Sequence, residues 1–86
     1  MAIKDTPKLY YDVVDITYDF LGPAADRFID RQIRNHLRKN PERINSHDLA
    51  GLIDWLRVAM AILTDDDKLV NDYVRQLRKL LKGIPT

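Results

Sequence analysis

Four arginines with a regular spacing are the residues of this sequence whose arrangement could do chemistry. They are separated by four, three and four positions, and they are Arg27, Arg31, Arg34 and Arg38. At about 100° per residue, this spacing places the four guanidinium groups within an arc of about 60° on one helix face. Guanidinium groups bind carboxylates and phosphates through paired hydrogen bonds. This arginine stripe therefore predicts a surface that binds an anionic partner.

The helix that must carry the stripe is predicted by the apolar residues between the arginines. Ile29, Ile33 and Leu37 recur with helical spacing on the opposite side. The stripe is therefore expected to face solvent while these three side chains are buried. Two structural explanations stay open beside anion binding. The arginines could form a solvated face that Asp30 partly neutralises along the helix, or they could pair with acidic residues of the first helix.

Helix start and stop signals divide the 86 residues of this single domain into four segments. Proline favours the first position of a helix, glycine its end, and Asn, Ser, Thr or Asp its N-cap. We therefore expect helices at about 7–21, 23–39, 46–63 and 65–82. Short connections favour antiparallel neighbours, so the predicted fold is all-α, a small up-down bundle of about four helices. The signals lie at Thr6, Pro7, Gly22, Pro23, Asn40, Pro41, Asn45, Ser46, Asp67 and Gly83.

The third segment, 46–63, is apolar over more than half of its circumference. Its strongest face is made by Leu49, Leu52, Ile53, Leu56, Met60 and Leu63. Such a helix is either the centre of the bundle, with both flanks covered by other helices, or it is shared with a partner. In the second case a glycine would let another helix approach closely, and the chain would form a homodimer. The residues of this possible oligomer interface are Gly51, Trp55, Val58 and Ile62.

A second basic face is expected near the C-terminus. The net charge alternates along the chain, from −3 over residues 1–26 to +4 over 27–43, −4 over 44–72 and +4 over 73–86. Cations in the last turns of a helix offset its dipole, which is one explanation for the last block. If this face adjoins the arginine stripe, nucleic acid becomes the alternative partner. The residues of the second face are Arg75, Arg78, Lys79 and Lys82.

An acidic face with tyrosines is expected on the first helix. Asp12, Asp15 and Asp19 lie opposite its apolar stripe, with Tyr11 and Tyr18 beside them. A tyrosine offers apolar area and a polar tip, so this face could contact a basic partner. The alternative is that the two rings lie flat on the rim of the bundle.

No set of residues predicts catalysis, a cofactor or a bound metal. The chain has no cysteine, which excludes disulfides and thiolate ligands. His36 and His47 lack the partners and spacing of metal ligands. The acidic run at 65–67 lacks the glycine and distal Glu of a calcium loop, so helix capping explains it better. No uncharged run approaches the ~20 residues of a membrane span, and the expected location is the cytoplasm.

These patterns favour a non-catalytic module for protein interaction or regulation. Another protein is the expected partner, and a homodimer is one form of that association. The alternative function is a small nucleic-acid-associated protein that uses the two basic faces. An oligomeric enzyme with a site shared between chains is a third hypothesis, because fold constrains function poorly.

Overall fold

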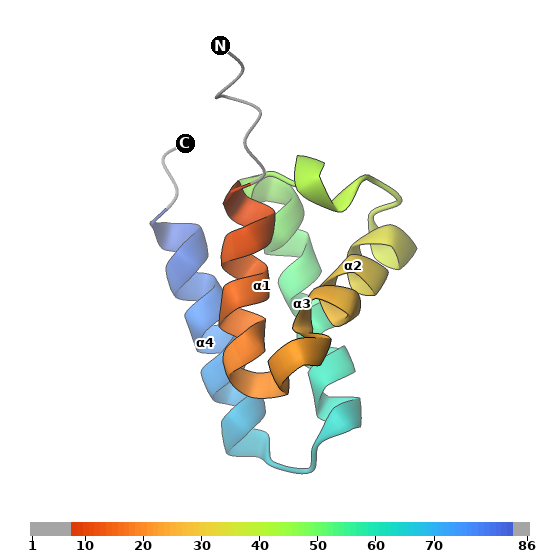
Figure 1. Ribbon diagram of the computed structural model, residues 1–86. Coiled ribbons are helices and arrows are strands. Elements are labelled where there is room, and N and C mark those ends of the chain that lie inside the picture. Colours follow the sequence, from red (N-terminus) through yellow and green to blue (C-terminus); the bar gives the residue numbers. More distant parts are fainter. Residues whose placement is uncertain (1–7, 84–86) are drawn as a thin grey trace.

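Helices account for nearly all of residues 8–83, the part of the chain that the structure, a computed structural model, describes. These residues contain no strand, and they form a small, compact helical domain, which confirms the predicted all-α class (Figure 1). Thr6 and Pro7, the expected start signals of the first helix, lie outside the described residues. The elements are α1 (Lys8–Leu21), η2 (Gly22–Ala24), α2 (Ala25–His36), η3 (Pro41–Arg43), α3 (Ser46–Leu63) and α4 (Asp67–Lys82).

The prediction of four separate helices is wrong in one respect. α1, the 3₁₀ turn η2 and α2 follow one another without a non-helical residue, so residues 8–83 hold three long helical stretches. Gly22 makes the elbow, since its φ of 66° is a left-handed conformation that glycine adopts without a Cβ penalty. Pro23 lies within η2, and α2 begins at the buried Ala25 instead of residue 23. Beyond the elbow, α2 runs obliquely to the other helices (Figure 1).

α2 also ends three residues before the expected position. The backbone N–H groups of Leu37 and Arg38 both donate to the carbonyl of Ile33, at 2.8 and 3.2 Å. Arg38 has a φ of 53°, the left-handed conformation that commonly closes a helix. The chain then turns so that Lys39 Nζ lies 2.6 Å from Asp48 Oδ2 at the start of α3. This ion pair fixes the connection between α2 and α3.

Side-chain caps set the beginnings of α3 and α4. Asn45 Oδ1 accepts from the N–H of Asp48, and Asp48 Oδ2 accepts from the N–H of Asn45, which is the reciprocal capping box. Asp66 caps α4 by accepting from the N–H of Leu69 at 3.2 Å. α4 therefore begins at Asp67, two residues later than the sequence predicted. The predicted start of α3 at residue 46 and the predicted ends at residues 21, 63 and 82 agree with the structure.

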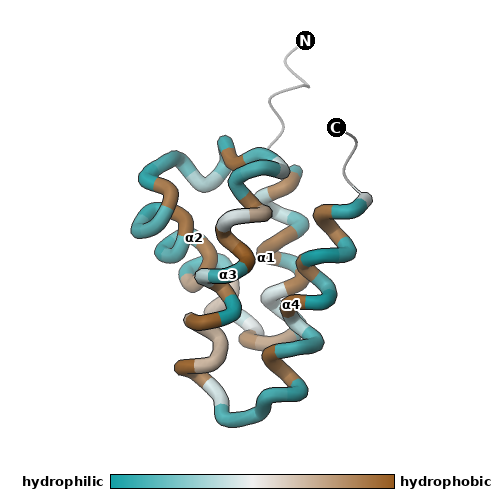
Figure 2. The backbone as a smooth tube through the Cα atoms, turned by 180° about the vertical axis from the view of Figure 1, so that it is seen from behind, coloured by the Kyte–Doolittle hydropathy of each residue, from teal (hydrophilic) through white to brown (hydrophobic). Residues whose placement is uncertain are grey.

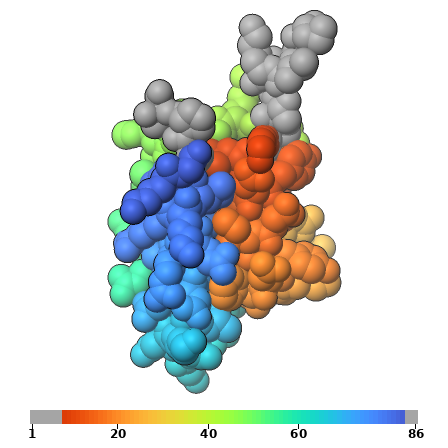
Figure 3. Space-filling view, turned by 90° about the vertical axis from the view of Figure 1, so that its left-hand side faces the viewer, coloured from red at the N-terminus to blue at the C-terminus, as the bar shows by residue number. Residues whose placement is uncertain are grey.

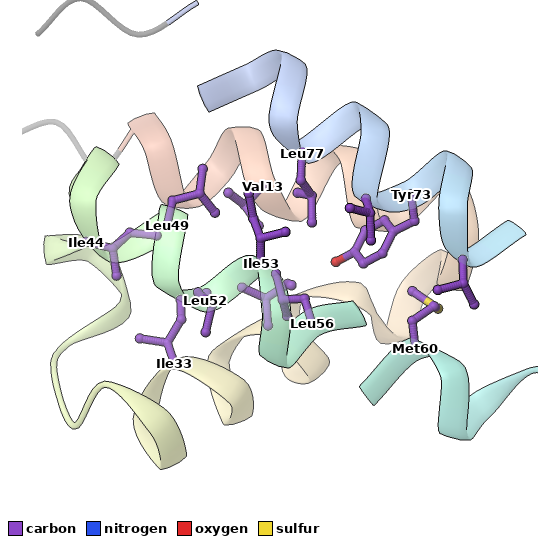
Figure 4. Packing of buried hydrophobic residues seen from close by; sticks show 13 residues of the cluster. Val13, Ile33, Ile44, Leu49, Leu52, Ile53, Leu56, Met60, Tyr73 and Leu77 are labelled. Carbon is purple, nitrogen blue, oxygen red and sulfur yellow. The ribbon is translucent and has the colours of Figure 1, made fainter. Parts of the chain in front are cut away.

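The core lies between α3 and the other three helices. Figure 4 shows side chains from all four α-helices and from Ile44 directed into one interior. α3 supplies more of them than any other element, and its five buried side chains are fully or almost fully covered. They are Leu49, Leu52, Ile53, Leu56 and Met60.

One buried polar pair joins α1 to α4 inside this core. Thr17 Oγ1 donates to the carbonyl of Val13 at 2.8 Å, so the hydroxyl of Tyr73, at 2.7 Å, donates to Thr17. Burial raises the pKa of Tyr73 above its ordinary value, and the hydrogen bond with Thr17 only partly opposes this. No buried side-chain nitrogen or oxygen in residues 8–83 lacks a hydrogen-bond partner.

Candidate functional site

The flank of α3 that faces away from the core is exposed. The exposed fractions are 50% for Trp55, 54% for Val58 and 79% for Ile62, and Gly51 is open as well. Both α2 and α4 pack against α3, yet they leave this side half or more exposed, and no helix lies across it (Figure 2). The explanation that α3 is simply a central helix with two covered flanks is therefore wrong. These four residues are called the outer face of α3 below.

A groove between α2 and α3 continues the outer face. It has a volume of about 600 Å³ and is mostly apolar. Ile62 belongs to both surfaces, so the apolar area is continuous. Leu63, which the sequence assigned to the buried face, is 57% exposed because it is the last residue of α3 and borders this groove. The groove is lined by Leu21, Ala24, Arg27, Phe28, Arg31, Gln32, Ala59, Ile62 and Leu63.

The four arginines of the predicted stripe lie in different environments. Arg27 and Arg31 are exposed and line the groove, and neither forms an ion pair with another residue of the 8–83 range. Arg34 is held along α2 by Asp30, with Nε 3.0 Å from Oδ2. Arg38 lies beyond the end of α2 with a left-handed backbone. The stripe on α2 therefore ends at Arg34, and Arg27 and Arg31 are the two arginines of the stripe that lie beside the apolar groove.

Trp55 is stacked on His36 of α2. The ring centroids are 4.1 Å apart and the planes differ by 10°. The stack holds the half-exposed indole in a fixed orientation, so it is available to a partner at little cost in side-chain entropy. His47 is exposed, and residues 8–83 contain no cluster of three His, Asp or Glu side chains that could hold a metal ion.

The second basic face forms a shallow groove between α3 and α4. α3 contributes Arg57, a residue that the sequence analysis left out and that the antiparallel pairing of α3 with α4 brings there. Arg75 Nη1 lies 3.1 Å from Asp72 Oδ1, so one cation is partly neutralised. α3 separates this groove from Arg27 and Arg31, so the two basic faces do not join (Figure 2). The groove is lined by Arg57, Asn71, Val74, Arg75, Arg78, Lys79 and Lys82.

The acidic face of α1 presents its tyrosines to solvent. α1 lies beside α4 (Figure 3), and Tyr11 and Tyr18 are 52% and 55% exposed. Asp15 and Asp19 are exposed too and form no ion pair within residues 8–83, whereas Asp12 is bound by Lys8 at 2.8 Å. The pairing between these acids and the arginines of α2 that the sequence left open does not occur.

Tyr10, whose ring centroid lies 5.3 Å from that of Tyr11, is turned toward α2. Burial, and then the negative charges of Asp30 and Asp26, raise the pKa of its hydroxyl. Tyr10 is therefore part of the α1–α2 contact, and the surface available on α1 is the one bearing Tyr11, Asp15 and Tyr18.

Comparison with known proteins finds no family model, no curated protein and no solved structure that matches this chain. No helix in residues 8–83 is long and apolar enough to cross a membrane. Sequence reasoning identified the outer face of α3 and the two arginines, but it missed Phe28 and Gln32. These two lie at the border of the apolar stripe of α2, and only the oblique packing of α2 turns them toward α3.

Proposed function

We propose that this chain is a non-catalytic protein-interaction module whose binding surface is the outer face of α3 together with the α2–α3 groove. The observation that carries the proposal is the exposure of large apolar side chains on one continuous area. Trp55, Ile62 and Leu63 are each half or more exposed, and contiguous apolar surface of this kind marks interaction sites.

The composition of the surface supports the same function. Tryptophan and arginine are the side chains most often responsible for binding energy at the centre of protein interfaces. Here Trp55 is held by the stack on His36, and Arg27 and Arg31 stand at the apolar groove without a carboxylate partner in residues 8–83. The partner favoured by this arrangement is a protein surface with apolar side chains and carboxylates.

The test is capture by the full chain before and after one charge is placed in the groove. Ile62→Asp should abolish the capture of the partner from native lysate by tagged protein, because it replaces the most exposed apolar side chain of the surface with a charged one. Gln76→Asp, which adds the same charge to an exposed position of α4, is the matched control and should capture as the wild type does. Equal capture by all three proteins, with unchanged melting temperatures, would reject this surface.

Nucleic-acid binding is the second candidate, and the α3–α4 groove is the observation that favours it. Arg57 from α3 joins the cations of α4 there, and no acidic residue lines the groove. Arg78→Glu with Lys82→Glu should lower the affinity for a labelled duplex oligonucleotide, with a steep dependence on salt, because phosphate neutralisation releases counterions. Affinity that the two substitutions leave unchanged would reject this function.

A further inference from the structure

The exposed apolar residues of this protein form two groups. Of the large hydrophobic side chains in residues 8–83, the exposed ones belong either to α1 or to the α3 side of the molecule. We propose that the two groups bind each other between copies, so that the α1 face of one chain occupies the α2–α3 groove of the next. This inference rests on the proposed function, since it names a second copy of the chain as the partner. The α1 group is Tyr11 and Tyr18, and the α3 group is Trp55, Val58, Ile62 and Leu63.

The charges of the two surfaces are complementary. Asp15 and Asp19 stand on the α1 face, and Arg27 and Arg31 stand on the groove. None of the four forms an ion pair inside residues 8–83. Each pair is spaced four residues apart on its helix, which puts the two Cβ atoms about 5–6 Å apart on both sides. Two carboxylate–guanidinium contacts can therefore form in one register.

The apolar side chains are arranged to fit the same contact. Tyr11, Asp15 and Tyr18 follow one line along α1, at positions i, i+4 and i+7, so both rings flank the carboxylate. The groove offers Phe28 from α2 and Ile62 from α3. A tyrosine can bury its ring against such side chains and keep its hydroxyl at the wet rim.

The two surfaces lie on opposite sides of the molecule, with α1 at the front and α3 behind it in Figure 1. A contact between them is therefore head-to-tail, and each copy in it keeps one free groove or one free α1 face. The competing arrangement is a two-fold contact between two grooves. That contact would bring Arg27 and Arg31 of both copies to one interface and would leave Asp15 and Asp19 unused.

The experiment is complementation between two charge-reversed full-length chains. One carries Arg27→Glu and Arg31→Glu, and the other carries Asp15→Lys and Asp19→Lys. Sedimentation up to about 1 mM should show concentration-dependent association of the wild type beyond a dimer. Each variant alone should associate at least about tenfold more weakly, because like charges then face each other. An equal mixture should regain association, since every contact between the two different variants again pairs opposite charges.

Neutral variants test whether a loss of association is caused by charge repulsion or by a defect in folding. Arg27→Gln with Arg31→Gln, mixed with Asp15→Asn and Asp19→Asn, should stop at a dimer, because the intact α1 face of the first variant fits the intact groove of the second and no other contact in the mixture pairs opposite charges. A wild type that remains monomeric up to about 1 mM overturns the inference. An Asp15→Lys and Asp19→Lys variant that associates normally, or a charge-reversed mixture that gains nothing, overturns it as well. The capture experiment with Ile62→Asp and Gln76→Asp still decides the proposed function in either case.

Discussion

The inner and outer faces of α3 have similar composition and opposite environments. Leu52 and Leu56 are completely buried, while Trp55 and Ile62, on the same helix, are 50% and 79% exposed. Both faces would gain free energy by leaving water, at roughly 25 cal/mol per Å² of apolar area. The inner face gains it from α1, α2 and α4, and the outer face can gain it only from another molecule. The inner face of α3 therefore stabilises the fold, and the outer face is the surface proposed for binding.

The largest expected difference is between truncations on the two faces. Leu56→Ala should lower the free energy of unfolding by roughly 2–5 kcal/mol, because it leaves a cavity in a packed core. Val58→Ala, at a position 54% exposed, should cost less than about 1 kcal/mol. Chemical denaturation measures both. Similar losses for the two variants would mean that α3 is rotated from its described orientation.

Two substitutions that remove the same buried hydrogen bond should differ in cost. Thr17→Val leaves the hydroxyl of Tyr73 without an acceptor inside the core and should cost about 1–3 kcal/mol. Tyr73→Phe leaves Thr17 still bonded to the carbonyl of Val13, so about 0.5–1.5 kcal/mol is expected. A double-mutant cycle by chemical denaturation measures the coupling. Equal costs would contradict the assignment of Tyr73 as the donor.

Alkaline pH should weaken the core in the same place. The pKa of Tyr73 is raised in the folded chain, so the unfolded chain loses its proton first as pH rises past about 10. Stability is therefore complete below that pH and should fall by about 1 kcal/mol by pH 11. Unfolding curves between pH 8 and 11 measure this, and Tyr73→Phe should flatten the dependence. Tyr10, whose pKa is also raised, should account for the slope that remains.

A methyl group added to the outer face should stabilise the chain. Gly51 lies inside α3, is exposed, and a Cβ placed there would meet no atom within 4 Å. Gly51→Ala should therefore raise the free energy of unfolding by about 0.5–1 kcal/mol through helix propensity. Thermal denaturation at low protein concentration measures it. A destabilised variant would show that something packs closely on Gly51.

The smallest expected effect on stability belongs to the residue expected to matter most for binding. Ile62→Asp should change the free energy of unfolding by no more than about 0.5 kcal/mol, because Ile62 is 79% exposed. Denaturation of the variant beside Gln76→Asp measures this. A loss of several kcal/mol would mean that Ile62 supports the fold, and the separation between the two faces of α3 would fail.

Local patterns in the sequence predicted what depends on neighbours along the chain. The 3.6-residue apolar period identified the inner face of α3, and Asn45 or Ser46 was the expected cap at its start. In the structure the cap is Asn45. The left-handed closure of α2 at Arg38 was missed. This closure accompanies the ion pair between Lys39 and Asp48, which spans the α2–α3 connection. The apolar periodicity of a single helix does not predict such a contact.

By itself, then, the sequence determined the helical class, several helix ends and which side of each helix is apolar, because these follow from hydrogen bonds and periodicity over a few residues. Only the tertiary structure decided which apolar faces are covered and which charges are paired. The Gly22 elbow turns α2 obliquely, and this opens the groove that joins Arg27 and Arg31 to Ile62. The physical reason is that the burial of an apolar face and the pairing of two charges both depend on distances between helices. The relative placement of the helices is set by the packing of the whole core.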